Sequence, residues 1–294
     1  PFPEEANRQM IGRLADFQFA PTQTAKAALI QENVRKEKIA IACSVAVDNV
    51  ISAPDISSIY DVPINFEKDK IGDMILRSLH MRAKVKGDVL ADWKKFVEKS
   101  KTAKKQLKIA VVGKYFDTGD FVLSDAYISV IEAIKFSSYW SGAKPELSWI
   151  NSKEYEVDPK KITELGRYDG IIVPGGFGES GIEGVLLAIR YARENKIPYL
   201  GLCYGMQLMV VEYARNMLGW ADAHTAEINP KSSHVVIDIM PEQKKNLEDG
   251  KYGATMRLGS YEAKLLKGTH AYKAYGTQTI HERHRHRYEV NPEY

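Results

Sequence analysis

A cysteine between two glycines is the feature that most constrains how this chain can fold. Residues 197–202 have the short apolar composition of a buried strand, and residues 204–218 carry apolar side chains at helical spacing. Cys203 therefore lies on the turn between a strand and a helix. Gly201 and Gly205 on either side allow the neighbouring backbone to pack closely, which predicts that the cysteine projects over the N-terminus of the helix.

This position also predicts a chemical role for Cys203. Backbone N–H groups and the helix dipole at a helix N-terminus favour a thiolate, so we expect a lowered pKa and a nucleophilic sulfur. The alternative is an inert core cysteine, which is the usual state of a buried thiol. The flanking glycines and the change from strand to helix favour the nucleophile.

The alternation of strands and helices predicts the fold class. Expected strands are 107–112, 147–150, 167–174 and 197–202, and expected helices are 124–139, 182–195 and 204–218. Short connections between them indicate an α/β domain with a mostly parallel sheet and helices on both faces. Ligands of such sheets bind beyond the carboxyl ends of the strands, where Gly175, Gly176 and Cys203 all fall.

The glycine pair fits the needs of acyl transfer through a cysteine. Attack on a carbonyl creates a negative oxygen that needs preorganised N–H donors. Gly175 and Gly176 expose their amides without a side chain, and the amide of Tyr204 can complete an oxyanion hole. Gly113-Lys114 is rejected as a phosphate-binding loop, because the earlier glycine of that motif and its Ser or Thr are missing.

The amino-terminal part of the chain indicates an incomplete domain. Strands are expected at 39–45 and 50–52, a turn or short helix at 55–60, and a helix at 66–80. An amphipathic helix around Trp93 and Val97 precedes a basic linker at 101–105. We therefore predict a partial domain at 1–83, an interdomain helix and linker at 84–106, and a second domain at 107–294.

Composition excludes several classes of protein. The 41 basic and 38 acidic residues nearly balance, so nothing indicates a nucleic-acid or polybasic membrane partner. The two cysteines, Cys43 and Cys203, form no disulfide or metal pattern, and no apolar run reaches membrane-spanning length. We expect a soluble cytoplasmic protein without a bound metal in this chain.

Several motifs together resemble one family. They are Pro174-Gly-Gly-Phe-Gly178, Gly201-Leu-Cys-Tyr-Gly-Met-Gln207, Ala214-Arg-Asn-Met-Leu-Gly-Trp220, Thr255-Met-Arg-Leu-Gly259 and Glu282-Arg-His-Arg-His-Arg-Tyr-Glu-Val-Asn291. In this order they are similar to the class I glutamine amidotransferase domain of the CTP synthase family. Segments 21–23, 38–43 and 57–60 resemble the closing part of that family's Rossmann-like synthetase, or amidoligase, domain.

The resemblance implies an activity and a set of site residues. The activity is ATP-dependent amination of UTP to CTP with ammonia released from glutamine. It makes Cys203 the nucleophile and Gly176, with Gly175, the oxyanion loop. Gln207 and Glu227 would hold the glutamine amino group. Arg283 or Arg285, with Arg285 favoured, would hold its carboxylate, and the charges agree with these roles. The alternative for Glu227 is a solvated loop acid.

The same resemblance implies nucleotide ligands and an assembly. Thr22, Gln23 and Lys38 would lie on the UTP side of the synthetase site. ATP and Mg²⁺ would bind residues that this chain does not contain, and GTP would activate the glutaminase. CTP would be an inhibiting product, and the complete protein would be a homotetramer.

The chain also departs from the family. Tyr204 stands where leucine is usual, and the family's catalytic His and Glu lie beyond Asn291, so we expect a truncated or discontinuous part of a longer enzyme. The alternative is a catalytically inactive amidotransferase-fold binding or assembly module. His281, His284 and His286 suggest a substitute base or a metal cluster. On a regular strand the latter two would share a face with Glu282, but the neighbouring arginines oppose a cation.

Overall fold

The fold is described from a computed structural model that covers residues 18–20, 23–31, 34–41, 54–82, 87–114, 127–250 and 256–294. The chain divides into two compact units, Pro1–Val97 and Glu98–Tyr294. This division lies inside the segment 84–106 that the sequence indicates as an interdomain connection.

The first unit contains a small parallel pair of strands and several short helices. Its described elements are β1 (Gln18–Ala20), α2 (Gln23–Gln31), a 3-10 helix (Lys36–Lys38), β2 (Ile39–Ile41), a 3-10 helix (Ile59–Asp61), α3 (Val62–Lys68), α4 (Ile71–Ser78) and the beginning of α5 (Ala91–Thr102). β1 pairs with β2. The strand expected at 39–45 is described only as far as Ile41, and the one expected at 50–52 lies outside the described residues.

The single helix expected at 66–80 is wrong. Two helices occupy this region, because Lys70 between them has a left-handed backbone with φ 55° that cannot continue a right-handed helix. α3 also begins earlier than expected, at Val62. Pro63 lies in its first turn, where the missing N–H of proline costs no helical hydrogen bond.

Aromatic packing attaches the turn at Tyr60 to the beginning of α5. The ring of Tyr60 meets the ring of Phe96 edge to face at 5.1 Å, and the Trp93 indole N–H donates to the Tyr60 carbonyl at 2.9 Å. An edge-to-face pair contributes about 0.5–1.5 kcal/mol beyond the area that it buries. α5 continues to Thr102 and the next strand begins at Lys105, so the basic linker expected at 101–105 is wrong.

The second unit is built on a four-stranded parallel sheet, and it confirms the predicted α/β fold class. The elements are β3 (Lys105–Gly113), α6 (Ile128–Trp140), β4 (Ala143–Asn151), α7 (Lys153–Val157), a 3-10 helix (Pro159–Arg167), β5 (Gly170–Val173), α8 (Ile182–Glu194), β6 (Tyr199–Gly201) and α9 (Tyr204–Met217). The strand order is β4-β3-β5-β6, and all neighbours are parallel.

The sequence alternation of β3 explains why helices cover both faces of this sheet. Ala110 and Val112 belong to the larger buried cluster, which contains residues of α8 and α9. Ile109 and Val111 belong to the cluster on the other face, with Ile134 of α6. Complete burial of a valine contributes about 1.5–3 kcal/mol, so both faces of this central strand stabilise the sheet.

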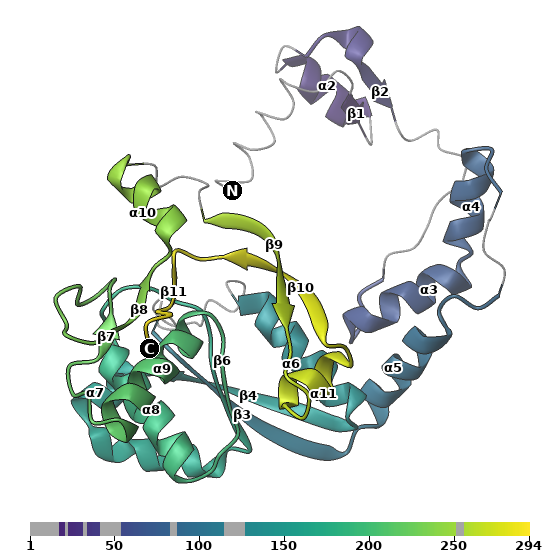
Figure 1. Cartoon of the computed structure of the whole chain (residues 1–294). Helices are drawn as coiled ribbons and strands as arrows, with labels where there is room; N and C mark the ends of the chain where they lie inside the picture. The colour runs from purple at the N-terminus through teal and green to yellow at the C-terminus, as the bar shows by residue number, and fades with distance from the viewer. Residues whose placement is uncertain are drawn as a thin grey trace. The chain divides into compact units, whose positions relative to one another are not determined.

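The carboxyl-terminal part adds two smaller sheets. Its elements are β7 (His224–Thr225), β8 (Val235–Ile239), α10 (Pro241–Glu248), β9 (Arg257–Lys264), α11 (His270–Tyr275), β10 (Thr279–Arg285) and β11 (Tyr288–Val290). β8 lies between β7 and β11, while β9 and β10 form an antiparallel hairpin (Figure 1). A bulge between His284 and Arg285 interrupts the regular alternation expected for residues 282–288.

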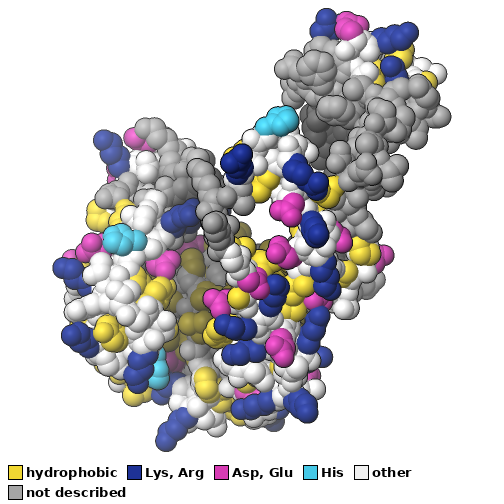
Figure 2. All heavy atoms as spheres, turned by 90° about the vertical axis from the view of Figure 1, so that its right-hand side faces the viewer, with side chains coloured by type: hydrophobic (Ala, Val, Ile, Leu, Met, Phe, Trp, Pro, Cys, Tyr) yellow, Lys and Arg dark blue, Asp and Glu magenta, His cyan; other side chains and the backbone are white. Residues whose placement is uncertain are grey.

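Charges of both signs share the surface. On the face drawn in Figure 2, Lys and Arg side chains are interspersed with Asp and Glu side chains, as the net charge of +3 leads one to expect. Several form exposed ion pairs, such as Lys95 with Asp92 and Lys161 with Glu154, which contribute about 0–1 kcal/mol each. Within the ranges that the structure covers, no helix combines the length and apolar character needed to cross a membrane.

Candidate active site

Cys203 occupies a strained turn between β6 and α9, as the sequence predicts. Its φ of 52° and ψ of −104° lie in a region that L-residues rarely adopt. The two glycines are required by close backbone contacts. A Cβ on Gly201 would lie 2.5 Å from the carbonyl carbon of Gly205, and a Cβ on Gly205 would lie 2.2 Å from the carbonyl oxygen of Val173. The turn therefore has the geometry of a nucleophile elbow.

The predicted lowering of the Cys203 pKa is wrong. Although the residue is exposed at the surface, burial of its thiol raises the pKa above the ordinary value. The backbone N–H of Tyr204 acts in the opposite direction, while the carboxylate of Glu227 raises the pKa further. The helix N-terminus alone does not overcome the loss of water around the sulfur, so the thiol form dominates at neutral pH.

The glycine pair lies beside the cysteine, as expected for an oxyanion loop. Gly175 and Gly176 follow the carboxyl end of β5, which pairs with β6. A Cβ built on Gly175 would lie 3.6 Å from the Cβ of Cys203, so the glycine loop lies directly beside the cysteine. The backbone N–H of Tyr204 also acts on the thiol, so the glycine loop and this amide both lie beside Cys203.

Lys114 is a site residue that the sequence reasoning missed. The rejection of a phosphate-binding loop left it without a role, but it lies buried at the carboxyl end of central strand β3, with 8% of its surface exposed. Its ammonium group donates to the carbonyl of Gly178 and lies 4.8 Å from the centre of the Tyr204 ring. A lysine that follows a buried central strand directly was the available signal.

Glu227 binds the same loop from the other side. Its carboxylate Oε1 accepts a hydrogen bond of 2.9 Å from the backbone N–H of Gly178, and the residue is partly buried. The solvated loop acid that the sequence left open is therefore wrong. Because this carboxylate also raises the Cys203 pKa, it lies within electrostatic range of the thiol.

Gln207 extends from the first turns of α9 and is buried. Its backbone N–H donates to the Cys203 carbonyl at 3.1 Å, which places it on the turn of helix that follows Cys203. Its side-chain Nε2 donates to the carbonyl of Tyr288 at 3.1 Å. This bond connects α9 to β11, the strand that follows the arginine-rich segment.

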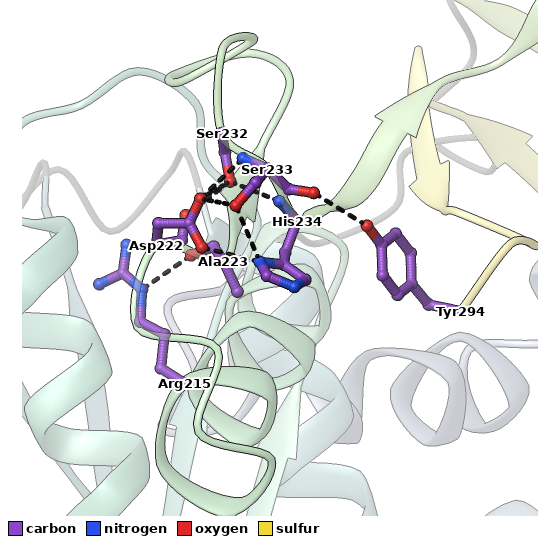
Figure 3. Close-up of polar contacts among 7 residues, drawn as sticks. All are labelled: Arg215, Asp222, Ala223, Ser232, Ser233, His234 and Tyr294. Atoms are coloured by element: carbon purple, nitrogen blue, oxygen red, sulfur yellow. Dashed lines mark hydrogen bonds and ion pairs between the residues drawn. The ribbon is translucent and has the colours of Figure 1, made fainter.

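A network around Asp222 closes the base of the loop that carries Glu227 (Figure 3). The Asp222 carboxylate accepts from the Ser233 hydroxyl at 2.6 Å, from the Ser233 N–H at 2.7 Å and from His234 Nδ1 at 2.8 Å. These bonds hold the pKa of Asp222 well below its usual range, the bond from the Ser233 hydroxyl having the largest effect and the bond from His234 the next. Arg215 of α9 donates to the neighbouring Ala223 carbonyl at 2.8 Å. The loop is thereby fixed to the helix that begins at Cys203.

Asp222, His234 and Ser233 are the residue types of a hydrolase triad, but they are not arranged as a triad. The carboxylate of Asp222 and the hydroxyl of Ser233 both approach Nδ1 of His234, at 2.8 and 3.2 Å. A triad needs the acid and the nucleophile on opposite ring nitrogens, so that the ring can carry a proton between them. The ring of His234 instead stacks on Trp220 at 4.9 Å, which is a structural contact.

Arg283 and Arg285 lie on β10 and are exposed. Within the described residues, neither guanidinium is hydrogen-bonded to the turn of Cys203 or to the glycine loop. The chain approaches the site soon afterwards, since Arg287 donates to Gln243 at 3.3 Å and the Tyr288 carbonyl accepts from Gln207. The structure therefore joins the strand after these arginines to α9 by a hydrogen bond, but it does not bond the two arginine side chains to α9.

The histidines give no partner for the cysteine. All seven lie within the described ranges, and none of them is hydrogen-bonded to Cys203. His284 stacks on Tyr261 at 5.0 Å, and burial lowers the pKa of His286, which lies beside it. In the part of the chain that is described, no group of three or more His, Cys, Asp or Glu side chains could hold a metal ion.

The residues assigned to the UTP side belong to the first unit. Thr22 lies outside the described residues. Gln23 begins α2 and Lys38 ends the 3-10 helix before β2, so only their backbone positions are described. Their role stays a prediction.

Comparison with models of known protein families gives two matches. The model of the family described as glutamine amidotransferase class-I matches residues 122–294, which contain the turn and the glycine loop. A second model, described as UDP-N-acetylglucosamine 2-epimerase, matches residues 1–141.

Curated relatives are similar over most of this chain. A CTP synthase of Caldanaerobacter subterraneus subsp. tengcongensis is 46% identical over 260 residues, covering 88% of this chain and 46% of the relative. One of Methanococcoides burtonii is 43% identical over 269 residues, covering 92% of this chain and 48% of the relative. The chain thus spans about half the length of the curated relatives it matches.

A solved structure is similar in fold and in sequence. It is the glutaminase domain of Trypanosoma brucei CTPS with bound acivicin, with a TM-score of 0.56 and 36% identity. The similarity covers 63% of this chain and 68% of that one. Together with the matched family model, this shows that the chain belongs to the class-I glutamine amidotransferase family, and that its curated relatives from both organisms are CTP synthases.

Proposed function

We propose that this chain carries the glutamine-hydrolysing part of a glutamine-dependent CTP synthase, with Cys203 as the nucleophile. The observation that carries the proposal is the closeness of the strained cysteine turn to the glycine loop, where a Cβ added to Gly175 would lie 3.6 Å from the Cβ of Cys203. Similarity to CTP synthases over 88% of the chain supports it. Ammonia released here would aminate UTP to CTP in the complete protein.

The chemistry follows from the geometry of the turn. The Cys203 sulfur attacks the side-chain carbonyl carbon of glutamine, and the carbonyl π electrons move to the oxygen. N–H groups of Gly175, Gly176 and Tyr204 would stabilise that negative charge. Ammonia then leaves with a proton, and water hydrolyses the thioester to glutamate. Because the Cys203 pKa is raised, a base must take the thiol proton during attack.

Substrate recognition needs two charges of opposite sign. Glu227 would bind the ammonium group of glutamine, supported by its position beside the glycine loop, and Gln207 would line the same end of the site. Arg285 or Arg283 would bind the substrate carboxylate with a guanidinium fork. Both side chains are exposed and therefore accessible to a ligand.

The remaining ligands belong to the complete protein and are proposed from its relatives. Thr22, Gln23 and Lys38 would lie on the UTP side of a synthetase domain at 1–83. ATP and Mg²⁺ would act there, GTP would activate and CTP would inhibit, in a cytoplasmic homotetramer. Since no described group of side chains fits a metal ion, no step of the glutaminase chemistry is assigned to Mg²⁺. The alternative, an inactive module, would leave the strained Cys203 turn without a use.

The first test is covalent labelling of the 294-residue chain. Acivicin, the compound named with the T. brucei structure, should modify Cys203, and L-glutamine should slow the reaction while D-glutamine should not. Peptide mass mapping distinguishes Cys203 from Cys43, and Cys203→Ser is the control. Equal labelling with and without L-glutamine would count against a glutamine site.

The second test uses the complete enzyme. Cys203→Ser should abolish glutamine-dependent CTP synthesis and spare synthesis from added ammonia, because the two chemistries occupy separate domains. Loss of both activities in a folded variant would contradict this division. For the 294 residues alone we expect labelling at Cys203 but no glutaminase turnover above background, since no histidine is bonded to the thiol.

A further inference from the structure

The backbone of Gly178 is held at both its N–H and its carbonyl, and this fixes the loop that would bind the oxyanion. Its N–H donates to Glu227 at 2.9 Å. Its carbonyl accepts from the Tyr204 hydroxyl at 3.0 Å and from the Lys114 ammonium group. Gly178 itself has φ 76°, so its backbone conformation depends on such restraints.

The side chains of Tyr204 and Lys114 also support the loop by direct packing. A Cβ on Gly176 would lie 3.5 Å from Cδ1 of Tyr204 and 3.8 Å from Cε of Lys114. The cavity between the loop and these residues has a volume of only about 10 Å³, which is the least that one water molecule needs. The loop therefore packs closely on both side chains.

Charge explains why a lysine is tolerated in this buried place. Burial lowers the Lys114 pKa, and the carboxylates of Glu227 and Glu156 act against that shift. The ammonium group also lies over the Tyr204 ring, where a cation is attracted to the aromatic face. Lys114, Tyr204 and Glu227 therefore form one connected group around Gly178.

We infer that the Tyr204 hydroxyl and the Lys114 ammonium group are positioning residues, which hold Gly178 so that the amides of Gly175 and Gly176 face the oxygen of the substrate carbonyl. The inference rests on the proposed function and deepens it. Neither side chain touches the reacting atoms. Both act through the loop, and Glu227, which is proposed to bind the substrate ammonium, holds the N–H of the same residue.

The effect should appear where negative charge develops on oxygen. A misplacement of a catalytic group by about 1 Å costs about 100-fold in rate, and loss of one oxyanion donor costs about 100- to 1,000-fold. Loss of one of two supports should cost less. We therefore expect an effect of about 10- to 100-fold from either variant on a ligand that forms an oxyanion. Ligands that form none should bind almost unchanged.

The test uses L-glutamate γ-semialdehyde, an aldehyde analogue of glutamine, on the 294-residue chain. The Cys203 sulfur adds to the aldehyde carbon, the π electrons move to the oxygen, and the thiol proton passes to solvent, which leaves a hemithioacetal with a negative oxygen in the oxyanion loop. Tyr204→Phe, which removes only the hydroxyl, should weaken binding of the aldehyde about 10- to 100-fold. Binding of L-glutamine to the same variant should change less than about threefold, or about 0.7 kcal/mol.

A matched control removes a buried tyrosine hydroxyl elsewhere. Tyr155 is completely buried in α7 and its hydroxyl donates to Glu164 at 2.9 Å. Tyr155→Phe should leave the ratio of aldehyde to glutamine affinity unchanged. Lys114→Met should resemble Tyr204→Phe, and Lys114→Arg, which keeps a charged donor, should recover part of the loss. If Lys114→Met does not fold, Tyr204→Phe alone decides.

The outcomes separate the two proposals. If the unmodified chain shows no Cys203-dependent aldehyde binding, the proposed function fails and the inference fails with it. If the unmodified chain binds the aldehyde and Tyr204→Phe binds it equally well, only the positioning role is overturned. Equal weakening of aldehyde and glutamine by Tyr204→Phe would also overturn it, because that pattern indicates general damage to the site.

Discussion

The cysteine turn and the β9–β10 hairpin, which the proposal assigns to opposite ends of one substrate, are held by different kinds of contact. At the turn, Gly201 and Gly205 meet backbone atoms so closely that no side chain fits. The hairpin forms a two-stranded sheet of its own, and Arg283 and Arg285 on it are exposed. Its bonds are surface contacts, such as that from the Tyr275 hydroxyl to Glu282 at 2.8 Å.

This difference indicates where each part tolerates change. The turn is determined by buried backbone packing, so substitutions there should act on folding before they act on chemistry. Surface pairs of the kind found on the hairpin contribute about 0–1 kcal/mol each, so substitutions there should leave the fold intact. Effects on the hairpin should appear in substrate binding instead.

Glycine substitutions give the largest expected contrast. Gly205→Ala would place a Cβ 2.2 Å from the Val173 carbonyl oxygen, and we expect a loss of about 3 kcal/mol or more in the free energy of unfolding, or no folding. Gly259→Ala on β9 meets no atom within 4 Å and only acquires an unfavourable φ of 80°, which costs about 1–2 kcal/mol. Urea unfolding of both variants measures the difference. Equal losses would contradict the contrast.

Glu227 should show the next largest effect, on glutamine binding. Removal of one partner of a buried charge pair costs about 2–5 kcal/mol in binding free energy. Glu227→Ala should therefore lower the affinity for glutamine about 30-fold or more. The measurement is the concentration of L-glutamine that protects Cys203 from iodoacetamide. Glu227→Gln keeps an acceptor for Gly178 and separates charge from loop support, and Glu154→Ala, which loses only a surface pair with Lys161, is the control. Unchanged protection in Glu227→Ala would remove Glu227 from the substrate site.

The hairpin arginines should differ from each other by a smaller amount. The bulge after His284 breaks the alternation between Arg283 and Arg285, and Arg285 lies nearer to Tyr288, which is bonded to Gln207. Arg285→Ala should lower the affinity for glutamine about tenfold, as expected for the loss of a hydrogen bond to a charged group. The free energy of unfolding should stay unchanged. Arg283→Ala is the matched control on the same strand. A larger effect of Arg283→Ala would exchange the two assignments.

The sequence predicts the nucleophile side well because its signals are local. Glycines around Cys203 and alternating apolar residues in β3 each report one backbone requirement, and the structure confirms both. Lys114 has a local signal, its place directly after a buried strand, but the sequence does not give its contact with Gly178, which lies far along the chain at another strand end. The break at Lys70 was equally invisible, since a lysine carries no sequence signal for a left-handed backbone.

The sequence could not give the Cys203 pKa, because two opposing causes act on it. A helix N-terminus favours thiolate, but burial, which depends on the whole fold, dominates. Carbonyl chemistry at this cysteine therefore needs a base, whereas a thiol that is already ionised would not. A neutral thiol with a raised pKa and a resting thiolate differ in how the rate of alkylation depends on pH.

The pH dependence of Cys203 alkylation should distinguish these cases. Iodoacetamide reacts with the thiolate, so the rate follows the ionised fraction and levels off above the pKa. With the pKa raised by burial, the rate should still increase beyond pH about 8.5, the ordinary thiol pKa, where free cysteine begins to level off. Glu227→Gln removes a negative charge that disfavours thiolate. Its profile should shift to lower pH, so that the rate at pH 8 increases. Glu154→Ala, a surface change, should leave the profile in place. A plateau below pH 7 in the unmodified chain would show that the helix N-terminus dominates after all, and that Cys203 is a resting thiolate.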